Sequence, residues 1–381
     1  MIVGEALLDA FINANILIVV AFVLWLGLRN LMERTAFRYA YDVQLGLLNA
    51  VFVAILCAPF LAAGVQALRG VGLAELLDVN LSDMVVSYYL NGGLEMKASE
   101  FEKLIMARDT LTLNILTAEG VFAQAVITAF LAGLALGVTR LAYSIFCLWR
   151  IVANSYSWRS FGRLRLRVSD HTLVPFSTRG WRNYYVVVPS HMLGQADEMK
   201  VALAHELQHI RGGDLEWEVL LEALKPLFFF NPAYHAWKRQ VEHLRELTCD
   251  RAVISHGRIE MRTYCETLLS ICQQTLRRDR AFVIAVPKVT LVTADRSSAA
   301  IGKPSLLEYR VLSLLNGAQI RRRKLLFAVL AIPLMICVAV TTLAIQRPAD
   351  WSQDRLMLST VVNLDRLNEI NRLSTFGRIR N

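Results

Sequence analysis

Two histidines and a glutamate lie close together in the stretch AHELQHI, residues 204–210. On a helix, His205 and His209 are four residues apart and share one face, so both rings can bind one metal ion while Glu206 stands beside them. A catalytic zinc takes three protein ligands and keeps one position for water, whose pKa the ion lowers. Glu206 would then be the general base and later the proton donor to a leaving amine. The spacing favours zinc-dependent hydrolysis over its alternative, a hydrogen-bonded pair of core histidines.

A third zinc ligand is expected in the stretch RELTCD, residues 245–250, where Glu246 and Asp250 are again four residues apart. On a helix beside the first, Glu246 can complete the zinc shell. Asp250, one turn further, can hold the second nitrogen of a ligand histidine and fix its tautomer. The alternative is a solvated charged face. Glu242 and His243 rank below Glu246 as candidate ligands.

The elements that must position these residues can be read from the surrounding pattern. We predict a helix over 197–210 that ends at Gly212 and Gly213, a second segment over 214–230 bent near Pro226, and a third helix from Asn231 to about His256. Upstream, the β-branched and aromatic runs 164–168 and 184–188 predict a small sheet or hairpin. The strand 182–188 offers an edge on which a peptide substrate can add as a strand, although a core strand is favoured.

The composition indicates a membrane protein. The 381 residues are 55% hydrophobic with a mean hydropathy of +0.40, and they still include 41 Lys and Arg. Six cysteines are scattered along the chain and predict reduced, structural thiols. Four apolar runs have the length that a membrane helix needs; they are Leu7–Leu28, Val43–Leu68, Val121–Leu148 and Leu325–Ile345. The first run contains Asp9 and has no basic segment before it, so it does not resemble a cleavable signal peptide.

The basic residues predict the orientation. Arginines gather in the loop 29–42, after the third run and directly before the fourth, and the positive-inside rule places all three sites in the cytoplasm. We therefore expect three membrane helices within 1–149 with an extracytoplasmic loop at about 69–120, a cytoplasmic domain over 150–324, the fourth helix over 325–346, and an extracytoplasmic tail over 347–381. Both termini then lie outside. The net charge of +9 matches the anionic inner leaflet of a plasma membrane, and no nucleic-acid-binding signature competes with that interpretation.

These motifs together resemble a known family. The stretch AHELQHIRGGD, followed by Asn231-Pro232 and then by RELTCDRAV, is similar to the BlaR/MecR-type membrane zinc metallopeptidases. The resemblance covers about residues 1–346, with its specific motifs within 173–253. It implies a mainly α polytopic membrane protein with four transmembrane helices and a cytoplasmic α+β zincin-like metallopeptidase domain. It also implies Zn²⁺ held by His205, His209 and Glu246, with Glu206 as catalytic base and with Asp250 and Asp214 supporting the ligands.

The resemblance further implies a signalling protease of a bacterial inner membrane. Known members respond to an envelope signal, often cleave themselves, and cause the inactivation of a cytoplasmic repressor. The segment 293–305 is similar to the family's self-cleavage region, although an ordinary linker fits equally well. The β-lactam sensors of the family carry a penicillin-binding domain after the fourth helix. Here only 36 residues, 346–381, follow, so we expect no such domain.

Two other functions stay open at this point. A quality-control protease of the HtpX type shares HExxH and a downstream Glu with Asp four residues later. A receptor or scaffold with a non-catalytic zinc site is the alternative outside the enzymes. The expected partners are a protein substrate, a cytoplasmic repressor or regulator above all, and membrane lipid, without direct contact to nucleic acid. The sequence leaves homo-oligomer formation open.

Overall fold

The structure of the chain is a computed structural model that describes residues 2–70, 81–257, 259–277, 306–315, 322–346 and 353–378. The segment 293–305, similar to the family's self-cleavage region, lies outside these residues. The chain divides into two compact units. The first comprises Met1–Leu24, Ala50–Leu131 and Ala328–Asn381, and the second comprises Trp25–Asn49 and Ala132–Phe327.

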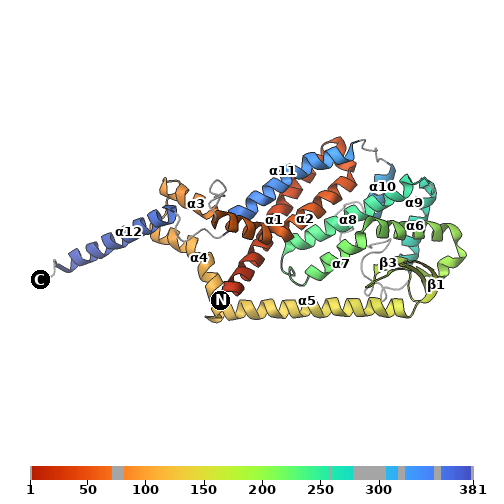
Figure 1. The fold of residues 1–381 in the computed structure, drawn as a ribbon, viewed down its shortest axis with the longest axis horizontal. Coiled ribbons are helices and arrows are strands. Elements are labelled where there is room, and N and C mark those ends of the chain that lie inside the picture. Colours follow the sequence, from red (N-terminus) through yellow and green to blue (C-terminus); the bar gives the residue numbers. More distant parts are fainter. Residues whose placement is uncertain are drawn as a thin grey trace. The chain divides into compact units, whose positions relative to one another are not determined.

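Four of the described helices are long and apolar enough to cross a membrane. They coincide with the four predicted apolar runs and are labelled in Figure 1: α1 (Ile2–Glu33), α2 (Tyr41–Gly70), α5 (Val121–Ala153) and α11 (Arg323–Ala344). A short 3-10 helix, η1 (Ala36–Tyr39), joins α1 to α2 and is capped by Thr35, whose hydroxyl accepts from the Phe37 N–H. The chain is therefore a mainly helical protein with four candidate membrane spans.

The first unit contains three further helices: α3 (Leu81–Leu90), α4 (Ala98–Thr117) and α12 (Gln353–Arg378). Buried apolar side chains of all three form one cluster; they are Val86, Ala98, Phe101, Leu358 and Val362. Arg366 of α12 and Glu102 of α4 form an ion pair of 2.9 Å. The helices α3 and α4 lie in the stretch 69–120, the predicted connection between the second and third spans, where the sequence analysis assigned no helices.

The second unit contains a four-stranded sheet in the order β1-β2-β4-β3. Its strands are β1 (Tyr156–Phe161), β2 (Leu164–Ser169), β3 (Phe176–Arg179) and β4 (Tyr184–Pro189). The prediction of a small sheet is confirmed, but a hairpin of 164–168 with 184–188 is wrong. These runs are neighbours that pair in parallel, because β3 lies between them in sequence and pairs antiparallel with β4 on its other side. β4 is therefore central and cannot accept an added strand, whereas β1 and β3 are edges.

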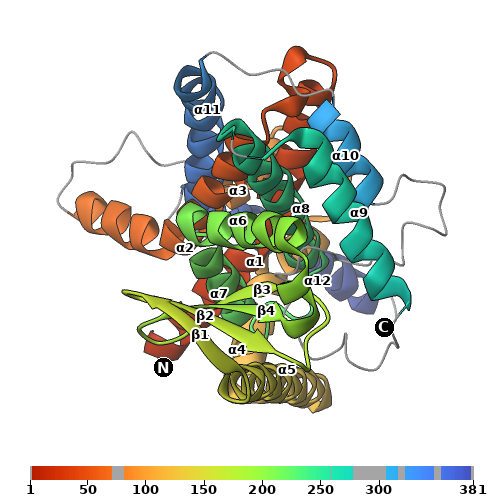
Figure 2. The same cartoon turned by 90° about the vertical axis from the view of Figure 1, so that its right-hand side faces the viewer.

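Helices cover the sheet and complete the second unit. They are α6 (Ala196–Gly212), α7 (Asp214–Leu224), α8 (Pro232–Ser255), α9 (Met261–Arg277) and α10 (Leu306–Leu315), with a 3-10 turn, η3 (Ser190–Gly194), before α6. Figure 2 shows α6 lying across one face of the sheet. Val186 and Val188 of β4 share a buried core with Val201 of α6, Cys249 of α8 and Tyr264 of α9. This core holds α6 and α8 side by side.

Candidate metal centre

The helix α6 carries both histidines of the AHELQHI stretch on its buried side. Asp197 and Glu198 in its first turn interact favourably with the positive end of the helix dipole and stabilise the start of the helix. The helix stops at Gly213, whose φ of 72° is the left-handed conformation that glycine adopts readily. This stop starts α7 at once, and Asp214 is thereby turned back toward His209.

The helix α8 supplies the carboxylates of the RELTCD stretch. Its first turn is fixed by Asn231, whose side-chain oxygen accepts from the N–H groups of Ala233 (3.0 Å) and Tyr234 (3.3 Å), and by Pro232 at the first helical position. Four turns later Glu246 and Asp250 face α6, and both are buried. The two motifs, about 40 residues apart in sequence, thus meet between two packed helices.

Three side chains converge on one point between these helices. Nε2 of His205 and Nε2 of His209 are 3.0 Å apart, and the Glu246 carboxylate lies 3.5 Å from the first and 3.6 Å from the second. Ligand atoms bound tetrahedrally at zinc distances are about 3.3 Å from one another. The positions and chemistry of these three groups therefore fit a single zinc ion.

The remaining ring nitrogens are occupied in a way that leaves both Nε2 atoms for a metal. Nδ1 of His209 lies 2.7 Å from Oδ2 of Asp214. Nδ1 of His205 lies 2.9 Å from the Tyr264 hydroxyl, which donates to Oδ1 of Asp250 at 2.6 Å. We assign the imidazole protons to Nδ1 from these contacts. Asp250 thus reaches His205 mainly through Tyr264, since its own distance to Nδ1 is 3.4 Å.

A buried arginine holds the two carboxylates of α8. Arg310 of α10 donates to both oxygens of Asp250, at 2.7 and 2.6 Å, and its Nη1 lies 3.1 Å from Oε2 of Glu246. Burial alone would raise the pKa of Glu246, but Arg310 and the histidines lower it to about 2. Burial likewise opposes the charge of Asp250, and Arg310 lowers its pKa below the ordinary value. Both groups are therefore carboxylates at neutral pH.

Among the described residues, Glu206 has neither a hydrogen bond nor an arginine partner, whereas Glu246 lies 3.1 Å from Arg310. It is fully buried, and neither oxygen has a hydrogen-bond partner among the residues that the structure describes. Burial raises its pKa, while the neighbouring His205 and His209 act in the opposite direction. An orphaned carboxylate in a protein interior is costly unless it meets a water, an ion or a substrate. Its position beside the converging nitrogens suits a group that takes protons from water.

Cys249 is a second neighbour of His205. Its thiol lies 3.6 Å from Nδ1 of His205, and His205, His209 and Cys249 by themselves form a compact group of potential metal ligands. However, Nδ1 points away from the point where the two Nε2 atoms meet, and Tyr264 already contacts it. Glu246 approaches the Nε2 atoms directly. The geometry therefore favours Glu246 over Cys249 as the third ligand.

The structure brings all six residues predicted for the site into one cluster and separates the weaker candidates from it. Glu242 pairs with Lys238 at 2.6 Å, and the His243 ring packs on Tyr309. Sequence reasoning missed Tyr264 and Arg310. An arginine within the apolar run LLEYRVLSLL, residues 306–315, is a signal that could have been used, since a charge in such a run needs a partner. No comparable signal marks Tyr264.

A second buried ionic network links α7 to α8 next to this site. Lys238 contacts Glu218 and Glu222 at 2.9 Å each, and Arg245 donates to Glu218 at 2.8 Å. Arg245 also contacts the backbone oxygen of Asp214 at 3.4 Å. This network fixes the start of α7 and, with it, the aspartate that holds His209.

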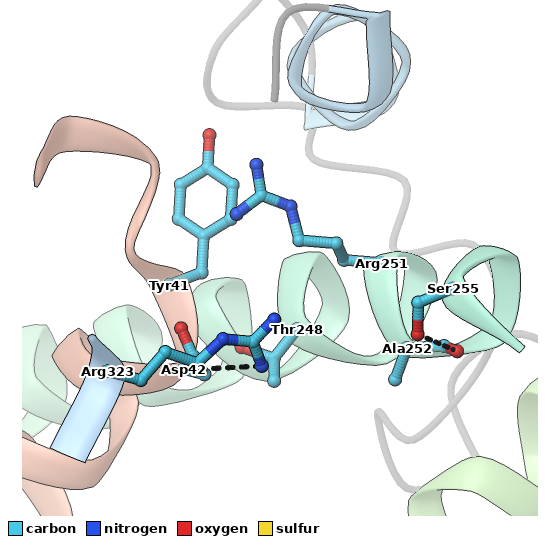
Figure 3. A pocket seen from close by; sticks show the side chains of 7 residues that line it. All are labelled: Tyr41, Asp42, Thr248, Arg251, Ala252, Ser255 and Arg323. Carbon is cyan, nitrogen blue, oxygen red and sulfur yellow. Dashed lines mark hydrogen bonds and ion pairs between the residues drawn. The ribbon is translucent and has the colours of Figure 1, made fainter. Parts of the chain in front are cut away.

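The opposite face of α8 lines a separate pocket (Figure 3). Thr248, Arg251 and Ser255 lie on this face, and the first residues of α2 and α11 complete the lining. Arg323 forms an ion pair of 3.1 Å with Asp42 there. Arg251 donates to the backbone oxygen of Tyr39, and its guanidinium lies 5.2 Å from the centre of the Tyr41 ring. The pocket shares helix α8 with the candidate ligand Glu246, but none of the candidate ligands lines it.

Comparison with known proteins agrees with this chemistry. Paired histidines and carboxylates on packed helices are a donor set that metallopeptidases use to hold zinc. The family model described as BlaR1 peptidase M56 matches residues 5–290, and the chain belongs to that family. The regulatory protein BlaR1 of Bacillus licheniformis is 34% identical over 71 residues, which are 18% of this chain and 12% of that protein. The chain is thus a member of the BlaR1 peptidase M56 family with four candidate membrane spans, and it aligns with only 12% of the length of this curated relative.

Proposed function

We propose that the protein is a zinc metalloprotease of a bacterial inner membrane, with its active site in the cytoplasm and both termini outside. It cleaves a regulatory protein, such as a transcriptional repressor, in response to an envelope signal, and the chain itself is a second candidate substrate. The observation that carries the catalytic part is the convergence of His205, His209 and Glu246 beside the orphaned Glu206. The regulatory part is supported by the family and by a relative that is itself a regulatory protein.

The residues divide the chemistry among them. His205, His209 and Glu246 would hold the zinc ion, which would supply Lewis acidity toward a scissile carbonyl and lower the pKa of water. Glu206 accepts the proton of the attacking water and returns it to the leaving amine; a pKa raised by burial suits a group that must do both. Asp214 and Tyr264 keep each ligand ring in the tautomer that presents Nε2. Protonation of either ring at Nε2 excludes the metal, so zinc binding should weaken in acid.

The burial of these residues supports a regulated enzyme. His205, Glu206 and His209 are at most 1% exposed. A peptide can therefore reach them only when the surrounding residues rearrange. The edge strand β3, which packs on α6, is the strand to which an extended substrate could add.

The experiment compares purified wild type with Glu206→Gln for bound zinc and for cleavage of candidate repressors and of the chain itself. We expect zinc in both proteins and cleavage only in wild type, because the substitution keeps the ligands and removes the base. Glu266→Gln, which alters an exposed carboxylate of α9 outside the cluster, is the control. Equal cleavage by wild type and Glu206→Gln would refute the assignment of the base. A wild type that degrades many unfolded membrane proteins would instead favour quality control.

A further inference from the structure

The edge strand β1 and the neighbouring loop between β3 and β4 carry a group of exposed aromatic side chains. Tyr156 and Phe161 of β1 are 67% and 57% exposed, Trp158 between them is also exposed, and Trp181 in the loop between β3 and β4 is 96% exposed. The turn between β1 and β2 lies beside the loop between β3 and β4, because the Tyr184 N–H donates to the Arg163 backbone oxygen at 2.9 Å. Rings of this size are rarely left in water without a partner surface. We call these four residues and their exposed arginine neighbours Arg159, Arg163, Arg165 and Arg182 the aromatic–basic surface.

The sequence that forms the sheet is strongly basic. Residues 150–195 contain seven arginines and no lysine, and Asp170 is their one acidic residue. The four arginines of the aromatic–basic surface are exposed, and the Arg159 guanidinium lies 5.7 Å from the ring centre of Trp158. Aromatic rings interleaved with arginines match a layer of anionic headgroups over an apolar interior. Protein interfaces are also enriched in aromatic residues and arginine, so the choice of lipid over an acidic protein depends on the position of the surface at the end of a membrane helix.

The surface is attached directly to a membrane helix. Large apolar side chains remain exposed along α5 as far as Trp149, at 65%, and no charged residue lies between Arg140 and Arg150. α5 ends at Ala153, only three residues before Tyr156. Arg167 of β2 donates to the hydroxyl of Ser155 at 2.6 Å and to its backbone oxygen. The hairpin of β1 and β2 is therefore fastened to the end of the span.

The direction of the hairpin agrees with a position along the membrane. Figure 2 looks along α5, and β1 and β2 run across that view, so the strands lie across the helix axis and do not continue it. A six-residue strand is about 20 Å long. Starting at the end of a span, such a strand can lie in the headgroup layer over its whole length. The Gly162 turn, with φ of 57°, brings Phe161 and Arg163 to the tip.

We propose that the aromatic–basic surface binds the anionic lipid headgroups of the leaflet at the end of α5, with its rings in the interface and its arginines on phosphates. The headgroups cover the free edge of β1, and the contact holds the sheet at a set height over the membrane. Because α6 packs on β4 and β3, this contact also sets the height of the candidate metal centre. The proposal requires α5 to cross the membrane, and it does not require the protein to be a protease.

The test is hydrogen exchange of the full chain in lipid nanodiscs. In discs that contain phosphatidylglycerol, we expect backbone exchange in 156–165 and 181–184 to be about tenfold slower than in discs of phosphatidylcholine alone. The double variant Arg163→Gln with Arg165→Gln should lose this difference. The control pair Arg211→Gln with Arg262→Gln removes the same charge from exposed positions elsewhere and should keep it.

Other outcomes would overturn the proposal. Equal exchange in the two kinds of disc would show that the surface does not bind anionic lipid. Equal slowing when inorganic phosphate is added to the detergent-solubilised chain would assign the surface to free anions. Slowing only on addition of polyglutamate would indicate an acidic protein partner. If the control pair also lost the lipid effect, the effect would be due to the net charge of the protein and not to this surface.

Discussion

The two faces of α8 make opposite use of polar residues. On one face Glu246 and Asp250 are buried, and Arg310 and Tyr264 contact their oxygens at hydrogen-bond distances. On the other face Thr248, Arg251 and Ser255 are partly or fully exposed, so water can reach most of their polar atoms, although Nη2 of Arg251 is buried without a hydrogen-bond partner in the described part of the chain. A buried polar group has no such substitute, and its partners must be placed accurately. Substitutions of equal size on the two faces of this helix should therefore change the free energy of unfolding by very unequal amounts.

The largest effect is expected from Arg310→Met. This change leaves two buried carboxylates without their cation, and we expect it to lower the free energy of unfolding by about 3–5 kcal/mol. Chemical denaturation in detergent measures the loss. Arg262→Gln is the control, because Arg262 pairs with Glu266 while 83% exposed, so its loss should leave the free energy of unfolding nearly unchanged. If Arg310→Met were as stable as the control, the contrast between the two faces would fail.

The ionic network beside the site should make stability depend on pH. Burial alone would raise the pKa of Glu218, but Arg245 and Lys238 lower it from 4.5 to about 2. A carboxylate with a lowered pKa in the folded state stabilises the fold above its unfolded pKa and loses this contribution as pH falls. The contribution is on the order of 3 kcal/mol and disappears between about pH 5 and pH 2. The free energies of unfolding of wild type and Glu218→Gln, measured across this pH range, should converge in acid. A constant difference between them would contradict the prediction.

A smaller and more specific effect is expected from Tyr264→Phe. The hydroxyl connects Nδ1 of His205 to Asp250, so its removal leaves two buried groups short of a partner and should cost about 1–3 kcal/mol. If Zn²⁺ binds as proposed, its affinity should fall roughly 10–100-fold, because the tautomer of His205 is no longer fixed. Competition with a chelator measures this. An unchanged affinity in a destabilised protein would give Tyr264 a purely structural role.

The unequal faces also explain what the sequence could predict. The histidines and the carboxylates of α8 are each paired at helical spacing, so a local pattern places them on one side of a helix. Tyr264 and Arg310 reach the same point from helices far along the chain, and no local period connects them to it. The parallel pairing of β2 with β4 was missed for the same reason: runs that look like a hairpin are separated by β3. The four candidate membrane spans were predictable because length and apolarity are properties of a single segment.

The smallest effect is expected on the pocket face, from Thr248→Ala. Thr248 is one residue from Cys249 and two from Asp250, yet its hydroxyl only donates back to the Leu244 oxygen of its own helix, at 2.7 Å. Such a local bond contributes little, so the free energy of unfolding should change by less than about 0.5 kcal/mol and zinc affinity should stay at the wild-type value. Denaturation and chelator competition, run beside Tyr264→Phe, make the comparison direct. A loss of affinity as large as that of Tyr264→Phe would mean that the two faces are coupled through the helix, and that the pocket at the starts of α2 and α11 can influence the metal centre.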